Sequence, residues 1–335
     1  MTIDDFAKAM ANEIMDAVPQ DVPLKDIEIV HVLKQNDVEQ VGLKITLEIE
    51  NLGAKIHPII YVNDAYDKCE AIDKVSGAEA QNVFYNYVHE FAGIISGERR
   101  GNNMRQTEMT LDNVKDHIRV KLLNAEKNSE YLVDKVYKEV EDLAMVYIIK
   151  TDEPYGVKNG VITITNDLRK QLGITLDELD EIAKKNMSKA EAEFRSLSEL
   201  VLEMMPPEMH DTLSPEEIKA ISDCPIPMYV LSNIERTNGA AMLFSDAAME
   251  QVREKIGDNV IIIPSSVHEV IILKDTGELN YDDVKALVGE VNMTEIRPEE
   301  VLSDNIYSYD FKEKTLSIIE DSRQLENDDY DDREL

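Results

Sequence analysis

Hydrophobic residues recur with two different periods along the first part of the chain. Four of them stand four positions apart and form one stripe of a predicted amphipathic helix: Phe6, Met10, Ile14 and Val18. Thr2 precedes this stripe at the position of an N-cap. Residues 41–49 then alternate between apolar and polar, and a partly alternating run, 27–33, comes before them. The pattern predicts a helix followed by an antiparallel hairpin with one buried face.

The middle of the chain combines one apolar run with helical signals. Residues 144–149 are almost entirely apolar and predict a buried strand. Thr175 and Glu178 have the spacing of a capping box, which predicts the start of a helix. Residues 190–205 predict a further helix, which ends at a pair of prolines.

The longest apolar runs lie between Pro225 and Leu273. The runs 228–231 and 240–244 predict two strands joined by a turn, in which Asn238-Gly239 is the tight point. Ser245 offers an N-cap for a following helix. Two more β-branched runs follow, 260–263 and 267–273, and Pro264 interrupts them. This stretch therefore predicts a β-β-α-β-β unit, with a helix after it at 281–291.

Together these elements predict an α+β protein whose mixed or antiparallel sheets are flanked by helices, in two or three modules. The predicted boundaries give an N-terminal module, 1–110, and a middle module, 111–207. A C-terminal β-β-α-β-β-α module follows at 208–318. Residues 319–335 are acidic and nearly free of apolar side chains, so they predict a disordered tail.

Eight residues of the stretch between Pro225 and Leu273 form the candidate functional surface. They are Asn233, Arg236, Asn238, Gly239, Ser265, Ser266, His268 and Glu269. A serine near a histidine invites a nucleophile-and-base interpretation. However, residues two apart on a strand lie roughly 6.5–7 Å apart, which exceeds hydrogen-bond reach. The chain also has no G-x-S-x-G motif. The alternative is a bulged strand whose polar groups satisfy the backbone, and we therefore assign no catalytic residue.

The charge of the chain narrows the classes of partner. Of its 335 residues, 68 are acidic and 35 are basic, which gives a formal net charge of −33. Phosphate backbones and anionic lipids need clustered Lys and Arg, so direct binding to nucleic acid or to a membrane is disfavoured. An acidic surface instead favours a basic protein partner, because opposite fields steer association. The simpler alternative is that the charge only keeps the protein in solution.

Metal and cofactor chemistry have no sequence signal. The six histidines and two cysteines show no H-x-x-x-H, H-E-x-x-H or C-x-x-C spacing. We therefore predict neither a metal nor a cofactor. The first residues lack the regions of a secretory signal, and no apolar run approaches the roughly 20 residues that span a bilayer. These features predict a cytoplasmic protein.

Several segments resemble one known family. They are PMYVLSN, NGAAMLF, IIIPSSVHEVIIL, PEEVLSDNIYSYD, HPIIYVNDAYD, DLAMVYII and ITNDLRKQLGITLDELDEIAKKN. The chain is similar to domain of unknown function 5688 over nearly its whole length, up to about residue 318. The resemblance implies a bacterial cytoplasmic protein, often carried near mobile elements. It implies no activity and no catalytic residues.

From these observations we predict a non-enzymatic binding or regulatory protein that engages a basic protein partner. A narrower form of the hypothesis is a protein associated with a mobile element or phage, which inhibits a nucleic-acid-handling host defence as an acidic decoy. The alternative is a hydrolase or transferase that uses the Ser265–Glu269 segment, and it requires those groups to converge in one pocket.

Overall fold

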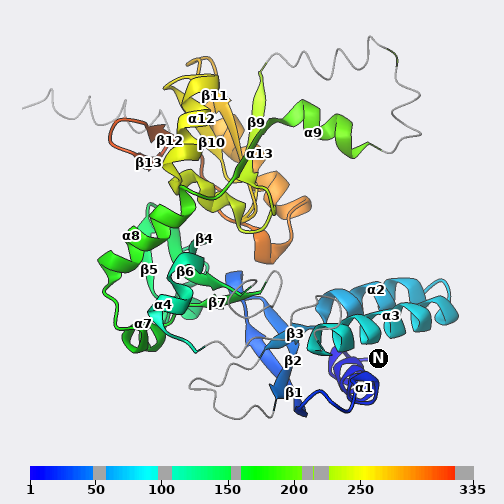
Figure 1. Ribbon diagram of the computed structural model, residues 1–335. Helices are drawn as coiled ribbons and strands as arrows, with labels where there is room; N and C mark the ends of the chain where they lie inside the picture. Colours follow the sequence, from blue (N-terminus) through cyan, green and yellow to red (C-terminus); the bar gives the residue numbers. More distant parts are fainter. Residues whose placement is uncertain (48–57, 97–107, 152–159, 206–213, 215–225, 321–335) are drawn as a thin grey trace, which may run out of the picture. The chain divides into compact units, whose positions relative to one another are not determined.

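The structure is a computed structural model that divides the chain into two compact units (Figure 1). It describes residues 1–47, 58–96, 108–151, 160–205, 214 and 226–320. The N-terminal unit comprises Met1–His117, Ile149–Ile162 and Asp167–Ile174. The C-terminal unit comprises Ile118–Ile148, Thr163–Asn166 and Thr175–Leu335. Most of the predicted disordered tail, 321–335, lies outside the described residues.

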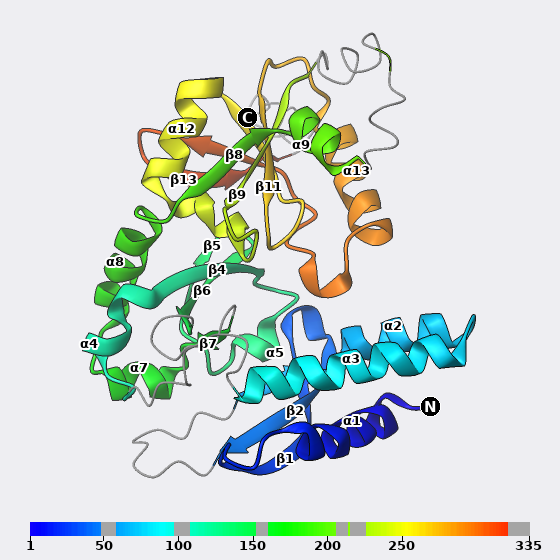
Figure 2. The same cartoon turned by 45° about the vertical axis from the view of Figure 1, so that its right-hand side comes forward.

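A helix, a three-stranded sheet and a helical hairpin build the N-terminal unit. Its elements are α1 (Ile3–Ala17), β1 (Leu24–Leu33), η1 (Gln35–Asp37), β2 (Glu39–Leu47), β3 (Ile59–Tyr61), α2 (Asn63–Asp73), α3 (Gly77–Ser96), α4 (Leu111–Val114) and η2 (Lys115–His117). The sheet order is β1-β2-β3, and both pairings are antiparallel. Helices α2 and α3 run side by side next to α1 (Figure 2).

The core of this unit follows from the two periodicities of its sequence. The Thr2 hydroxyl caps α1 by accepting a hydrogen bond from the Asp5 backbone N–H. The apolar stripe of α1 is buried together with alternate residues of β2 and one face of α3: Phe6, Met10, Ile14, Val41, Leu43, Ile45, Val88 and Phe91. Burial of these side chains therefore fixes α1 against both the sheet and the hairpin.

Two sheets and their helices make up most of the C-terminal unit. The smaller sheet has the order β4-β6-β5, with β7 paired to β6. These strands and the helices near them are β4 (Ile118–Asn124), α5 (Ser129–Leu132), β5 (Tyr137–Val140), β6 (Leu143–Lys150), β7 (Val161–Thr163), α7 (Asn166–Leu172) and α8 (Leu176–Met187). Strands β6 and β7 and helix α7 each cross a limit between the two units.

Helix α8 is tied to the smaller sheet by Asp180. This buried carboxylate accepts hydrogen bonds from Tyr147 Oη and Lys138 Nζ, both at 2.8 Å, and pairs with Lys184 at 3.1 Å. Burial raises the pKa of Asp180, but the hydrogen bonds from Lys138, Tyr147 and Lys184 outweigh it and hold the pKa below its usual value.

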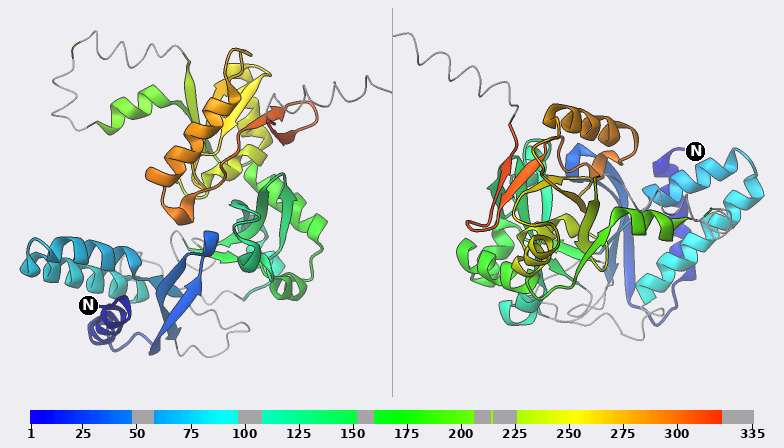
Figure 3. Two further views of the ribbon diagram at one scale, coloured as in Figure 1. Left: turned by 180° about the vertical axis from the view of Figure 1, so that it is seen from behind. Right: turned by 90° about the horizontal axis from the view of Figure 1, so that it is seen from above.

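The larger sheet is antiparallel and has the order β13-β12-β10-β11-β9-β8. Its elements are β8 (Ala192–Ser196), α9 (Leu197–Met204), β9 (Met228–Asn233), η3 (Gly239–Phe244), α12 (Asp246–Ile256), β10 (Val260–Ile263), β11 (Val270–Lys274), α13 (Tyr281–Thr294), η4 (Pro298–Glu300), β12 (Tyr307–Asp310) and β13 (Thr315–Ile318). Helices α12 and α13 lie on opposite sides of this sheet (Figures 2 and 3). Val288 of α13 packs against Ile261 and Leu273.

The predicted fold class is confirmed, because the chain is α+β with antiparallel sheets. The first helix, the hairpin after it and the capping box of Thr175 and Glu178 are also confirmed. The predicted module boundaries stay predictions. Residues 111–117 group with the N-terminal elements, whereas 118–148 group with the C-terminal ones.

Two predicted elements are wrong. Residues 240–244 form the 3-10 helix η3 instead of a strand. Ala240 to Leu243 are all buried, so the run is apolar because it is enclosed on every side, and such a run carries no period. The predicted helix over 190–205 is in fact strand β8 followed by α9. β8 pairs with β9 over five residues, and this tertiary pairing overrides the local helical propensity.

The two sheets of the C-terminal unit are joined through the carboxylate of Asp142. Asp142 lies in the two-residue turn between β5 and β6, where Glu141 takes a positive φ of 55°. Its Oδ2 accepts hydrogen bonds from Ser303 Oγ (2.6 Å) and Asn305 Nδ2 (3.0 Å), and its Oδ1 accepts one from Tyr307 Oη (2.6 Å). Burial and, to a smaller extent, the hydrogen bond to Asp142 raise the pKa of Tyr307 well above its usual value. The carboxylate therefore fixes the chain that leads into β12 onto the smaller sheet.

We predict that Asp142→Ala lowers the free energy of unfolding by about 3 kcal/mol, because four donors, Asn124 Nδ2 at 3.4 Å among them, lose a charged acceptor. Tyr307→Phe removes one of those bonds and lowers it by about 1–2 kcal/mol. Urea unfolding followed by circular dichroism measures both values. Glu250→Ala, at an exposed position on α12, is the control and changes stability by less than about 0.5 kcal/mol. Equal stability of the Asp142→Ala variant and the control would contradict the role of this carboxylate.

Candidate functional site

The first half of the candidate surface is the loop between β9 and η3. Asn233 organises this loop: its Nδ2 donates to the Thr237 carbonyl at 2.9 Å, and its Oδ1 accepts from the Thr237 N–H at 3.2 Å. Arg236 and Asn238 take positive φ angles of 49° and 54°. The loop is thus a tight turn closed by an asparagine side chain, a role to which asparagine is suited.

The second half is the loop between β10 and β11, where Pro264 ends the strand as predicted. The hydroxyl groups of its two serines hydrogen-bond to backbone groups of the same loop. Ser265 Oγ donates to the Glu269 carbonyl at 3.1 Å, and Ser266 Oγ accepts from the His268 N–H at 3.0 Å. The Ser266 N–H also bonds the Glu269 carbonyl at 3.2 Å. The segment is therefore a compact loop, and not the bulged strand that the sequence suggested.

The two loops contact each other directly, so the structure brings the predicted residues together. Ser232 Oγ donates to the His268 carbonyl at 2.8 Å, and the Asn238 N–H donates to His268 Nδ1 at 3.2 Å. Gly239 fits between the loops because it has no side chain. A Cβ there would lie 2.1 Å from Ser232 Oγ and 2.4 Å from the His268 carbonyl oxygen. The sequence predicted a need for glycine at 239 because a tight turn needs one. The structure shows a different reason, because the contact between the two loops leaves no room for a side chain there.

The ring of His268 is held in one orientation by both its nitrogens. Because Nδ1 accepts from Asn238, the neutral ring carries its proton on Nε2, which lies 3.5 Å from Glu300 Oε1. A general base needs a lone pair directed at the proton it removes. Here that lone pair already binds a backbone N–H, and the imidazole is not hydrogen-bonded to either serine. The arrangement suits a structural histidine.

Arg236 connects the candidate surface to the edge strand β8. Its guanidinium forms two parallel hydrogen bonds to Glu193, both at 2.7 Å. Glu193 also lies 3.6 Å from Arg195, which pairs with Glu203 at 2.6 Å. The bonds from Arg236 hold the pKa of Glu193 below its usual value, against a smaller effect of burial. Four charged side chains thus form a continuous line along β8.

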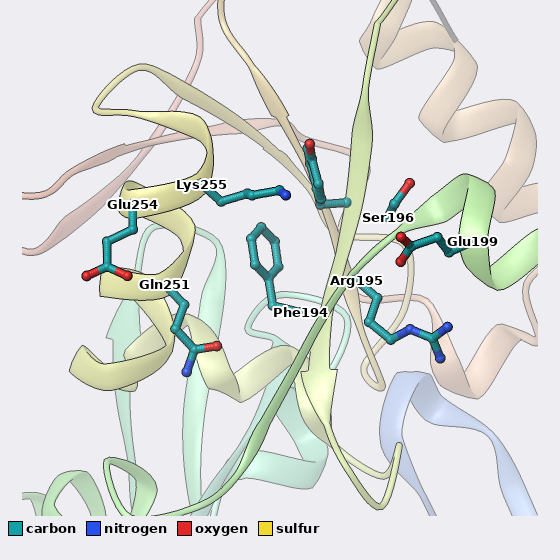
Figure 4. Close-up of a pocket in the computed structure, with 8 residues that line it drawn as sticks. Phe194, Arg195, Ser196, Glu199, Gln251, Glu254 and Lys255 are labelled. Atoms are coloured by element: carbon teal, nitrogen blue, oxygen red, sulfur yellow. The ribbon is translucent and has the colours of Figure 1, made fainter. Parts of the chain in front are cut away.

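Beside this line lies an open depression of about 340 Å³ between β8 and α12 (Figure 4). The Phe194 ring packs against the Tyr229 ring, with centroids 5.3 Å apart. Lys255 extends from α12 toward the same rings, and its Nζ lies 5.9 Å from the centroid of Tyr229. Glu199 and Arg195 lie on the other side of Phe194. Aromatic surface flanked by both charges is suited to binding, and this lining contains no histidine or cysteine.

Lys121 is a buried lysine on β4 that no sequence pattern indicated. Its Nζ donates to Tyr131 Oη at 3.2 Å, and Tyr131 Oη also contacts Thr163 Oγ1 at 3.2 Å. Burial, with a smaller effect from the charge of Lys135, lowers the pKa of Lys121 to about 8. An amine with this pKa is a potential nucleophile, but the side chain is only 7% exposed. It therefore has no route to a substrate in this conformation.

Metal-ligand clusters and membrane-spanning helices are both absent from the residues that the structure describes. In that part of the chain, no three His, Cys, Asp or Glu side chains gather as metal ligands would. No described helix combines the length and the apolar character needed to cross a bilayer.

The model of a family described as "Family of unknown function (DUF5688)" matches residues 3–311. The chain belongs to this family. The match confirms the resemblance found in the sequence. It also covers all eight residues of the candidate surface. Comparison with curated proteins gave no match, and comparison with solved structures gave none either. The description of the family assigns no role to any residue.

We predict that Gly239→Ala destabilises the protein by about 3 kcal/mol, because its Cβ overlaps backbone atoms that cannot move independently. Gly289→Ala is the matched control, since a Cβ at this position in α13 meets nothing within 4 Å. In that helix, alanine stabilises by up to about 1 kcal/mol. Thermal and urea unfolding of the two variants measure both effects. The same response from both variants would show that the contact between the loops is not tight.

Proposed function

We propose that this chain is a non-enzymatic binding protein that engages a basic protein partner. The observation that carries the proposal is a distribution of charge. The chain has a formal net charge of −33, and many of its cationic side chains are already bound to its own carboxylates. The excess of negative charge is what supports a partner of opposite sign.

Cationic side chains in both units form ion pairs with carboxylates of the same chain. Lys44 pairs with Glu28 in the N-terminal unit. In the C-terminal unit the cations Lys127, Lys138, Arg195, Arg236, Arg253 and Lys314 each have a carboxylate partner. Such pairs add little stability where they are exposed, but they cancel the positive field that nucleic acid or anionic lipid would need. This supports a basic protein as the partner.

The hydrogen bonds made by the candidate serines and histidine favour a binding function over catalysis. The hydroxyl groups of Ser265 and Ser266 bond the backbone, and the Nδ1 lone pair of His268 does the same. The hydrolase or transferase alternative needs Ser–His contact, which these bonds replace. The narrower hypothesis, a decoy that inhibits a nucleic-acid-handling host defence in association with a mobile element or phage, rests on the same negative charge.

We predict that the immobilised chain retains positively charged proteins from a bacterial lysate at low salt and releases them between about 50 and 300 mM NaCl. Screening of exposed charges over this range accounts for the release. Mass spectrometry identifies the proteins released. The matched bait is an unrelated folded protein with the same net charge.

Partners bound by this chain and not by the matched bait support the proposal. Retention of the same proteins by both baits shows that charge alone acts, and it overturns the proposal. Absence of any retained protein also overturns it.

We also predict that a fluorophosphonate probe, which labels activated serines, does not modify Ser265 or Ser266. Neither hydroxyl is activated by an imidazole in the structure, so both should react no faster than ordinary serines. Intact-mass and peptide mass spectrometry report any adduct, with a known serine hydrolase as the positive control. Stoichiometric labelling of Ser266 that is lost in His268→Ala would favour the hydrolase alternative.

A further inference from the structure

A groove between the first three helices has the features of a docking site. It lies among α1, α2 and α3, has a volume of about 350 Å³, and is contained within the N-terminal unit. Aromatic rings form its wall. Phe6 packs edge-on against Tyr66 and against Phe84, both with centroids 5.4 Å apart. Tyr85 continues this wall and is 39% exposed.

The wall is rigid on one side because it belongs to the core. Phe6 is 1% exposed and packs with Met10 and Ile14 beneath the groove. Tyr66 Oη donates to the Met1 carbonyl at 2.8 Å, which fixes the start of α1 beside α2. Because this aromatic surface is already ordered, binding a partner does not require the entropy cost of ordering its side chains.

The charges at the groove are almost entirely of one sign. Glu70 and Asp73 line it from α2, and both are exposed. They are three residues apart, so they lie on the same side of the helix. Among the described residues that line the groove, none is a lysine or arginine, and the amino terminus of Met1 is the one cationic group. The depression on β8 differs, because Arg195 and Lys255 line it.

We propose that this groove binds a segment of a partner protein that presents an apolar side chain flanked by lysine or arginine. The apolar side chain contacts Tyr66, Phe84 and Tyr85, which are accessible in the groove, and the cation lies against Glu70 and Asp73. An apolar centre with a charged rim is the usual composition of a protein interface. This inference rests on the proposed function, and it names the site and the chemistry of the segment recognised.

The test measures binding of a synthetic amphipathic peptide of leucine and lysine by isothermal titration calorimetry at low salt. Two control peptides separate the contributions: one of leucine and glutamate, and one of serine and lysine. The full-length chain is expected to bind the leucine–lysine peptide at least tenfold more tightly than either control. Equal binding of the leucine–lysine and serine–lysine peptides would overturn the proposal, because the apolar groove would then contribute nothing.

A charge reversal with a matched control locates the site. Glu70→Lys is expected to weaken binding at least tenfold, since it replaces an attraction with a repulsion. Asp67→Lys changes the net charge equally on the same helix, but this residue does not line the groove, so we expect less than a twofold effect. Ala9→Trp fills the groove without changing charge and is expected to weaken binding as much as Glu70→Lys. Circular dichroism verifies that each variant is folded. Equal effects of Glu70→Lys and Asp67→Lys would overturn the site.

Cys69 gives an independent measure of occupancy. Its thiol lines the groove, and burial raises its pKa, so modification is slow and is followed at about pH 8.5. In a Cys224→Ser background, the leucine–lysine peptide is expected to slow modification of Cys69 at least fivefold. An unchanged rate in the presence of bound peptide places the peptide elsewhere and overturns the proposal.

Two further outcomes identify other occupants or separate the two proposals. Sedimentation velocity of the chain alone tests for a second copy, and a dimer that Ala9→Trp dissociates would show that the groove binds this chain itself. If the partners retained specifically by the wild-type chain are also retained by Glu70→Lys, the groove is not the site but the proposed function stands. If the wild-type chain retains no specific partner, the proposed function itself fails.

Discussion

The arrangement of the C-terminal unit depends on one carboxylate that accepts hydrogen bonds from a segment far along the chain. Asp142 stands in a tight turn of the smaller sheet and binds Ser303, Asn305 and Tyr307. The chain just before this segment passes the candidate surface, where the Glu300 carbonyl accepts the Val267 N–H at 2.9 Å and its side chain faces His268. Because one group fixes residues 303–307, it also fixes the approach of Glu300 to the loop at 265–269. The contact of Glu300 with the candidate surface therefore depends in part on bonds made elsewhere.

The hydrogen-bonding requirement of the backbone explains why residues that resemble a catalytic set make structural contacts. A tight loop leaves N–H and C=O groups that must find partners, and short polar side chains supply them. Ser265 and Ser266 bond the backbone within their own loop, and Asn233 closes the other. His268 then joins the two loops through a backbone N–H. Several of the polar residues concentrated here therefore bond the backbone where the two irregular segments meet.

The depression on β8 and the groove among α1, α2 and α3 differ in the side chains that line them, and this decides what each can bind. The depression on β8 has aromatic rings with charges of both signs, and its arginine is already paired with glutamates. The groove among α1, α2 and α3 has an apolar wall and a rim that is mainly acidic. Opposite charges speed the encounter of two proteins, while buried apolar contacts supply most of the affinity that remains at high salt. A partner of a strongly acidic chain needs both, and the groove offers them together.

Periodicity along the sequence was enough to predict α1, the first hairpin, the capping box of Thr175 and the break at Pro264, because each depends on residues a few positions apart. In β12 the buried Tyr307 and Tyr309 alternate with exposed Ser308 and Asp310, which is a local pattern of the same kind. Tertiary structure decided what has no local pattern. Residues 240–243 are all buried, so their apolar run has no period that would distinguish the 3-10 helix they form from a strand. β8 is a strand because β9 pairs with it. The bond from Ser303 to Asp142 spans 161 positions, and that from Arg236 to Glu193 spans 43. Contacts between polar groups at such separations leave no period in the sequence, so only the folded chain shows which of them meet.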